Sequence, residues 1–419
     1  MKISLPYPAR RAIWTSILVL LAFAVYFSVR SAMADWSYLE GTADSVSAAV
    51  SQEPGNAGYH ALLAEFDESS GGSPAPQLTA ATALSPLSSL YLIRAALRAE
   101  VDSDYPTAER LLRRAAEVDH KFSPRWALLN FYFRRGSATG VWPQGFWPTV
   151  NSALEMSSPG DTDAVFRLAW EHSQDPEAIL SRLPVERKIQ EAYLRFLVGT
   201  SRMDPASKVA LRLASAAEAS GAGLLLDYTE RALAVNAGSA VAVWNALIAR
   251  KLVPYAPLRP DLGAILTNKN FAAAAAPRGF DWRITPVDGV FVSQADDDRG
   301  LSVHFDGSEP EDCVLVKQTM PVLPGREYRI GFTCSSSASS SSGASGNVMR
   351  GLRWDITSGG KMIAASAELD SAADGAPGVL VFKTGAETAV LALHYQRPLG
   401  TVRAEGTMVI RGLTDQIVK

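Results

Sequence analysis

The sequence predicts a multidomain α plus β protein with an apolar N-terminal helix, a helical region and a C-terminal antiparallel β-sandwich. Three features predict this: an uncharged apolar run near the N-terminus, apolar residues at helical spacing as far as about Pro254, and short alternating segments from about Leu266. A chain of 419 residues, 47% of them hydrophobic, is also long enough to bury more than one core.

The N-terminal apolar run is long enough to cross a membrane. Residues Ala12–Val29 carry no charge, and a bilayer core needs about 20 apolar residues in helical form. Lys2, Arg10 and Arg11 precede the run, whereas only Arg30 follows it closely. Because positive charge marks the cytoplasmic side, we expect a single pass through a bacterial inner membrane, with the N-terminus in the cytoplasm and the bulk in the periplasm.

The alternative for this run is a signal peptide that is removed. Ala32-Met33-Ala34 matches the small-residue pattern of a cleavage site. However, the run is longer than the usual core of a signal peptide, and Arg30 interrupts the approach to the site. We therefore expect residues 1–35 to form a retained anchor. Both interpretations export the remainder of the chain.

A helical domain is expected over residues 36–254, and it contains an internal repeat. Small and large apolar residues alternate on either side of a turn at His120–Pro124: Ala108, Leu112 and Ala115 before it, and Trp126, Leu129 and Phe133 after it. This order resembles the tetratricopeptide repeat, from which the chain departs at His120 and Asn130. A weaker copy covers Val46–Ala64. The resemblance implies a tetratricopeptide-like α-solenoid whose concave groove binds a protein partner.

Residues 255–265, which include two prolines, are expected to link this domain to a sandwich over residues 266–419. Alternating segments separated by Gly, Pro, Asp and Ser predict its strands: Phe280–Thr285, Leu301–Phe305, Val314–Val322, Glu327–Cys334, Leu352–Ile356, Val379–Lys383, Ala389–Tyr395 and Thr407–Arg411. The segment Ser335–Gly346 is almost pure Ser, Ala and Gly, so we expect a flexible surface loop there.

Three segments of the sandwich region carry a resemblance. They are Leu266–Phe271, with Asn before Phe, Gly279–Trp282, and a stretch that runs from Gln318 through Pro324-Gly325 to Tyr328. They resemble the jelly-roll carbohydrate-binding modules and related galactose-binding-like domains. Repeats followed by such a sandwich also resemble bacterial membrane-anchored tetratricopeptide proteins, some of which are thought to accompany envelope polysaccharide (exopolysaccharide) pathways. The resemblance implies a polysaccharide ligand but supplies no site.

Glycan binding needs a flat aromatic face and a few rigid polar groups. Trp282, Trp354 and Tyr395 stand beside charged or polar residues, and Arg397 follows Tyr395 at a strand end, so these four are the candidate glycan contacts. The competing interpretation is that the rings fill the core. In that case alternation along the strand places the neighbours of Trp354, Arg353 and Asp355, on the outer face.

The two cysteines, Cys313 and Cys334, stand almost symmetrically about a turn at Leu323–Gly325. If the flanking strands pair as a hairpin, the cysteines lie opposite each other and can form a disulfide in an oxidising compartment. If the strands belong to opposite sheets, the thiols are either too far apart or pair across the core. The alternative is two buried thiols.

The sequence lacks the motifs that carry common chemistry. It contains no Gly-x-Ser-x-Gly, no glycine-rich phosphate loop and no His-Glu-x-x-His. The five histidines are scattered, and three consecutive acids at Asp296–Asp298 cannot all face one calcium ion, so we expect neither a metal nor a cofactor. A net charge of −3 without a basic stripe argues against nucleic acid as a partner.

Taken together, these features favour a non-enzymatic envelope protein in which the repeats hold a protein partner and the sandwich holds glycan or stabilises the assembly. One alternative is a pure assembly factor without a glycan ligand. The other is a glycan-processing enzyme, for which Asp281 and Asp355 are the acids to inspect, because paired carboxylates are brought together in space rather than in sequence.

Overall fold

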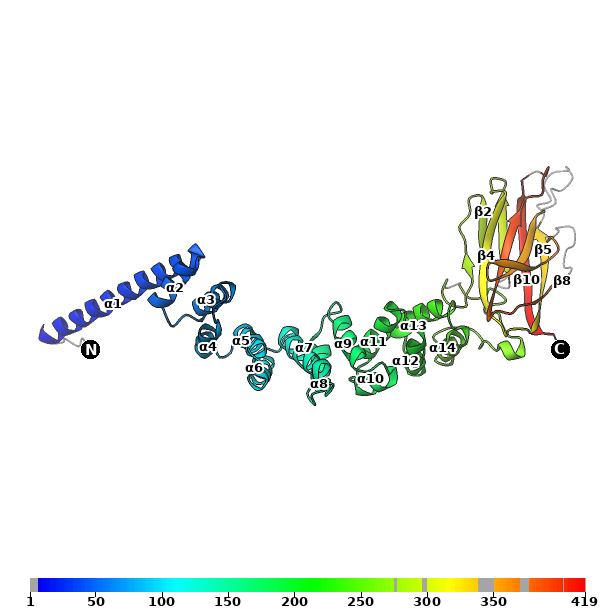
Figure 1. Cartoon of the computed structure of the whole chain (residues 1–419). Coiled ribbons are helices and arrows are strands. Elements are labelled where there is room, and N and C mark those ends of the chain that lie inside the picture. Colours follow the sequence, from blue (N-terminus) through cyan, green and yellow to red (C-terminus); the bar gives the residue numbers. More distant parts are fainter. Residues whose placement is uncertain are drawn as a thin grey trace, which may run out of the picture. The chain divides into compact units, whose positions relative to one another are not determined.

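The structure is a computed structural model that describes residues 7–274, 277–295, 300–337, 350–369, 377–401 and 403–418. The chain divides into two compact units, Met1–His172 and Ser173–Lys419. Helices fill the first unit and begin the second, and two antiparallel sheets follow (Figure 1). This confirms the predicted α plus β class with a C-terminal sandwich. Asp296–Asp298 and positions 338–346 of the predicted flexible loop lie outside the described residues.

Consecutive helices pack against each other throughout the first unit, and most helices of the second unit do so as well. The helices of the first unit are α1 (Tyr7–Glu40), α2 (Ala43–Gln52), α3 (Ala57–Ser69), α4 (Ala75–Leu84), α5 (Ser89–Val101), α6 (Tyr105–Val118), α7 (Phe122–Thr139), α8 (Phe146–Met156) and α9 (Thr162–His172). Those of the second are α10 (Pro176–Arg182), α11 (Arg187–Gly199), α12 (Met203–Ser215), α13 (Ala219–Ala232), α14 (Ala237–Ala249) and the short 3-10 helix η1 (Pro260–Leu262).

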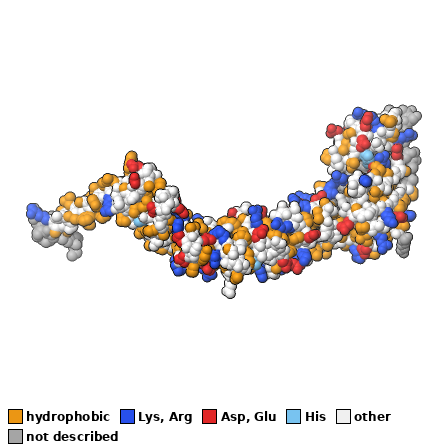
Figure 2. Space-filling model, in the orientation of Figure 1, with side chains coloured by type: hydrophobic (Ala, Val, Ile, Leu, Met, Phe, Trp, Pro, Cys, Tyr) orange, Lys and Arg blue, Asp and Glu red, His pale blue; other side chains and the backbone are white. Residues whose placement is uncertain are grey.

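Helix α1 is longer than the predicted apolar run and continues to Glu40 without a break. Within the described residues, Arg11–Glu40 is the one helix that is long and apolar enough to cross a membrane, and its most apolar part is 0% buried. Hydrophobic side chains cover its surface in Figure 2.

The last turns of α1 pack on α2 and α3. Ala34 is fully buried against Ala49 and Tyr59, and the Tyr59 hydroxyl donates to the Asp35 carboxylate. Burial, and then this hydrogen bond, raise the pKa of Tyr59 to about 12. The alternative cleavage motif at Ala32–Ala34 therefore lies inside a helix whose last motif residue is enclosed by its neighbours.

The predicted turn at His120–Pro124 separates α6 from α7. The Asp104 carboxylate accepts from the Thr107 backbone N–H at 3.2 Å and caps the first turn of α6. Ala108, Leu112 and Ala115 then form one fully buried helix face, because residues three and four apart lie on the same side. The helix pair is confirmed, whereas its membership of the tetratricopeptide class stays a prediction.

The sandwich consists of two five-stranded antiparallel sheets. One has the order β1-β4-β9-β6-β7 and the other β2-β3-β10-β5-β8. The strands are β1 (Arg283–Ile284), β2 (Val290–Gln294), β3 (Leu301–Asp306), β4 (Asp312–Pro321), β5 (Glu327–Ser337), β6 (Leu352–Ser358), β7 (Lys361–Ala365), β8 (Pro377–Lys383), β9 (Thr388–Gln396) and β10 (Glu405–Ile417).

Most predicted strands coincide with observed ones, and the differences lie at sheet edges. Phe280–Thr285 is reduced to the two-residue edge strand β1, and the edge strands β2 and β7 were not predicted. Edge strands bury little on either face, so their sequences lack a clean apolar alternation. The centre of the sandwich is aromatic: the rings of Trp282 and Trp354 lie 5.9 Å apart.

Within the second unit the sandwich is fastened to the helices that precede it. The Trp244 ring of α14 meets Phe280 edge-on at 5.8 Å, and the Asn245 side chain exchanges two hydrogen bonds of 2.9 Å with the backbone of Leu258. The buried Asp415 carboxylate accepts from the backbone N–H groups of Ile265 and Leu266. The segment 255–265, predicted as a linker, is thus held by hydrogen bonds at both ends.

Candidate functional site

The outer face of the sheet that contains β4, β9 and β6 carries a connected set of polar side chains, which we call the polar array. Its members are Asp312, Arg353, Asp355, His394 and Gln396. Leu352, Trp354 and Ile356 of β6 point into the core, so Arg353 and Asp355 between them point outward. The register places Arg353 opposite His394, and Gln396 opposite Asp312.

Hydrogen bonds run without a gap through the polar array. The Asp355 carboxylate accepts from Arg353 Nε at 2.9 Å and lies 2.6 Å from His394 Nδ1. His394 Nε2 lies 2.8 Å from Asp312 Oδ1, and Arg353 Nη2 donates to Gln396 Oε1 at 3.1 Å. Both ring nitrogens of His394 face carboxylates, and both can donate only when the ring is protonated.

Asp355 lies at the centre of the array. It is on an outer face of the sheet, yet it is only 4% exposed. A carboxylate at that depth needs partners, and Arg353 and His394 supply them. Asp312, in contrast, has a side chain that is 61% exposed. The array therefore presents a rigid centre with an accessible rim, which is the arrangement that hydroxyl-rich ligands need.

The three aromatic rings predicted to contact glycan lie in the core. Trp282 and Trp354 are 0% exposed and Tyr395 is 1% exposed. Trp354 and Tyr395 alternate with the outward polar residues of β6 and β9, and the interpretation that all three rings fill the core fits the structure. The expected stacking role does not fit these positions, because a sugar could reach the rings only by displacing the core.

Tyr395 has a structural role beneath the array. Its hydroxyl donates at 2.8 Å to the buried Glu309 carboxylate, which also accepts from the Ala404 backbone N–H. Burial, and next the hydrogen bond to Glu309, raise the pKa of Tyr395 well above its ordinary value. Tyr395 therefore stays a neutral donor that fixes the β3–β4 connection.

Arg397, the fourth predicted glycan contact, follows directly after β9. Its guanidinium forms an ion pair with Glu311, and its backbone N–H donates to the Glu311 carbonyl at 2.8 Å. Arg397 and Glu311 are thus the chain neighbours of Gln396 and Asp312, two members of the array, but they pair with each other. Alternation along β6 and β9 identifies Arg353, Asp355, His394 and Gln396 from sequence, whereas Asp312 becomes a neighbour only through the register of β4.

The cysteines do not lie on a hairpin. Cys313 is on β4 and Cys334 on β5, and these strands belong to opposite sheets, so of the two alternatives the hairpin is wrong and the arrangement on opposite sheets is observed. The chain crosses from one sheet to the other at the turn between the two strands. The thiols are not joined by a disulfide in the structure. Burial, then the nearby Asp312 and Glu309 carboxylates, raise the pKa of Cys313 to about 11.

The two acids considered for glycan hydrolysis have different surroundings. Asp281 is fully buried and accepts from the Tyr255 hydroxyl at 2.7 Å and from the Trp282 backbone N–H. Asp355 lies on the outer face, in the polar array. In the described part of the chain, no group of three His, Cys, Asp or Glu residues is placed to hold a metal ion.

Comparisons with known proteins find similarity to solved structures. No family model matches the chain, and no curated protein matches it. A solved structure titled "CBM4 structure and function" is similar over 36% of this chain and 98% of its own length, with 12% sequence identity and a TM-score of 0.27. The assignment of a β-sandwich rests on the two sheets described above.

Both cysteines are expected to react slowly with a thiol reagent in the folded protein and quickly once it is unfolded. A pKa of about 11 instead of 9.0 leaves Cys313 with a thiolate fraction about a hundredfold smaller at pH 8, and Cys334 is buried. Because folding raises this pKa, the folded state should lose stability as the pH rises from 9 towards 11.

Thiol counting without reductant, first in native buffer and then in guanidinium chloride, checks this. Two thiols per chain should be released on unfolding, and Cys313→Ser and Cys334→Ser assign them. Release of no thiol on unfolding would show that the two cysteines had formed the disulfide considered from the sequence.

Proposed function

We propose that this chain is a non-enzymatic, membrane-anchored binding protein of the bacterial envelope, with a helical region that holds a protein partner and a sandwich that binds glycan through the polar array. The observation that carries the glycan part is the array itself. Its carboxylate, guanidinium, imidazole and amide groups are fixed by one another around the nearly buried Asp355. Groups of this kind recognise sugar hydroxyls, and fixing them in advance lowers the entropic cost of binding.

The anchor part of the proposal is supported by α1. Its most apolar stretch is 0% buried in the described chain, and Ala34 at the alternative cleavage site lies inside a helix and is enclosed by Ala49 and Tyr59. A retained anchor accounts for the unburied apolar surface and for the enclosed Ala34. An N-terminus in the cytoplasm, with the remainder in the periplasm, accounts for the charges around the apolar run.

The protein-binding part is supported by an exposed apolar stripe on α5. Leu90, Leu97 and Val101 lie seven and four residues apart, on one face of the helix, and are 60%, 44% and 72% exposed. Leu97 and Val101 also line a cavity of about 490 Å³ with Tyr105, Arg134 and Arg135. Such a surface fits an apolar peptide segment that carries a carboxylate, because the lining holds two arginines and one glutamate.

Photocrosslinking in the native membrane tests this surface. A photoreactive residue at Val101 should capture a partner, whereas one at Val235, 63% exposed in the turn between α13 and α14, should not. Equal capture at both positions would contradict a specific groove.

The proposal also states that the chain does not hydrolyse glycans. The two inspected acids occupy separate environments, and the raised pKa of Cys313 disfavours a thiolate nucleophile. A hydrolysis screen against envelope glycans with Asp281→Asn and Asp355→Asn checks it. Turnover that either change abolishes would favour the glycan-processing enzyme instead.

Glycan binding should depend on the array. Gln396→Ala removes an exposed member, and Arg353→Lys keeps the charge but loses the forked geometry, so each should weaken binding by about tenfold, the equivalent of one hydrogen bond. Lys361→Ala, an exposed residue of β7 on the same sheet, is the matched control and should bind like the unchanged chain.

A glycan array probed with the full chain in detergent identifies the ligand, and calorimetry measures each variant. If no glycan binds, the sandwich has no sugar ligand and the pure assembly factor becomes the better account. If Lys361→Ala weakens binding as much as Gln396→Ala does, the site lies elsewhere on the sheet.

A further inference from the structure

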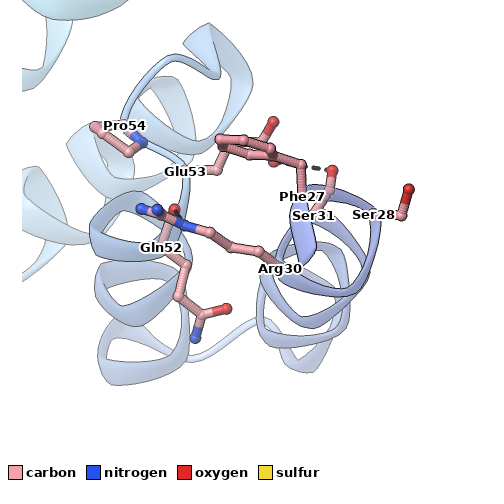
Figure 3. Close-up of a pocket in the computed structure, with 7 residues that line it drawn as sticks. All are labelled: Phe27, Ser28, Arg30, Ser31, Gln52, Glu53 and Pro54. Atoms are coloured by element: carbon pink, nitrogen blue, oxygen red, sulfur yellow. Dashed lines mark hydrogen bonds between the residues drawn. The ribbon is translucent and has the colours of Figure 1, made fainter. Parts of the chain in front are cut away.

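A cavity of about 560 Å³ lies where the apolar run of α1 ends. Its lining comes from two segments, the last apolar turn of α1 and the turn between α2 and α3: Phe27, Ser28, Arg30, Ser31, Gln52, Glu53 and Pro54 (Figure 3). If α1 spans a bilayer up to Val29, this cavity lies at the level of the lipid headgroups, because the hydrocarbon core ends with the apolar run.

Arg30 is held at the cavity by the end of α2. Figure 3 shows its side chain reaching across from α1, and its Nε–H donates to the Gln52 carbonyl oxygen. That carbonyl stands at the C-terminal end of a helix, where the partial negative charge attracts a cation. A guanidinium has further N–H donors, and no carboxylate in the described residues forms an ion pair with Arg30.

Glu53 provides an opposite charge in the same lining. Its carboxylate accepts from the Ser31 hydroxyl at 3.1 Å and forms no ion pair within the described chain. Gln52 also contributes to the lining, but its side-chain oxygen is buried and its side chain extends away from Glu53 in Figure 3. The cavity thus holds a cation and an anion, and different neighbours keep the two apart.

We propose that this cavity binds the headgroup of a phospholipid that carries a primary ammonium group, with its phosphate on Arg30 and its ammonium on Glu53. The proposal rests on the proposed function, because α1 must span the membrane for a lipid to reach the cavity. Phosphate suits a guanidinium, and an ammonium with three N–H donors suits a carboxylate. Phe27, 56% exposed beside the cavity, offers an apolar surface to the acyl chains.

Other headgroups satisfy only part of this lining. A choline headgroup has no N–H to donate, so Glu53 gains no hydrogen bond from the lipid. An anionic headgroup without an amine satisfies Arg30 but places negative charge against Glu53. The site therefore selects ethanolamine over choline and over glycerol headgroups, and the Glu53 carboxylate sets the preference over choline.

The experiment uses the full chain in nanodiscs of phosphatidylethanolamine, phosphatidylcholine and phosphatidylglycerol in equal amounts, with retained lipids counted by native mass spectrometry. The unchanged chain should retain ethanolamine lipid over choline lipid by about tenfold, the equivalent of one charge-assisted hydrogen bond. Glu53→Gln keeps an acceptor for Ser31 but removes the charge, and should abolish this preference. Arg30→Gln should reduce retention of all three lipids.

Glu40→Gln is the matched control, since Glu40 lies on the same helix, away from the cavity lining, and accepts from Trp36. It should retain ethanolamine lipid like the unchanged chain. Equal retention of the three lipids, or a preference for phosphatidylglycerol, overturns the headgroup site while leaving the anchor intact. A chain that alkaline extraction removes from membranes overturns the anchor and the site together.

Discussion

The exposed apolar surface of α1 is the constraint on which the rest of the account depends. In water a helix with this surface would be an aggregation site, whereas in a bilayer each central Leu, Ile, Phe or Val contributes about 0.3 to 0.6 kcal/mol to insertion. A helix also satisfies its own backbone hydrogen bonds, as a span in lipid must. If α1 spans a membrane, the cavity at its end and the helices that follow it all lie on the same side of that membrane.

Within each unit, a small number of buried contacts holds neighbouring elements together. At the end of α1, Ala34 packs between Ala49 and Tyr59, so the span continues into the helical region without a flexible joint. In the second unit, Trp244 packs on Phe280, and Glu230 accepts from the backbone of Gly279. The sandwich therefore packs directly on helices α13 and α14 and is not joined to them by a free linker alone. These contacts fix the position of the sandwich, with its outer polar face, relative to the two helices.

Periodicity predicted the elements well and the contacts between distant strands poorly. The alternation of Trp354 with Arg353 and Asp355 placed the ring and the charges on opposite faces, as the structure has them, but it did not tell which face is the core, and Trp354 was a candidate glycan contact. The position of Asp312 beside His394, 82 residues away, depends on sheet register, which one sequence does not reveal. The same reason left the arrangement of the two cysteines open. Their symmetry about a turn does not distinguish a hairpin from a crossing between sheets, and the structure has the crossing. The sequence did not predict the cavity around Arg30, because its lining comes from two separate segments of the chain.

The central claim is that α1 anchors the chain and places everything after it outside the cytoplasm. Paired C-terminal fusions in a bacterial host test this most directly, one to alkaline phosphatase, which is active only outside the cytoplasm, and one to a fluorescent protein that matures only inside it. The account predicts phosphatase activity in the membrane fraction and no fluorescence. Fluorescence together with inactive phosphatase would contradict it.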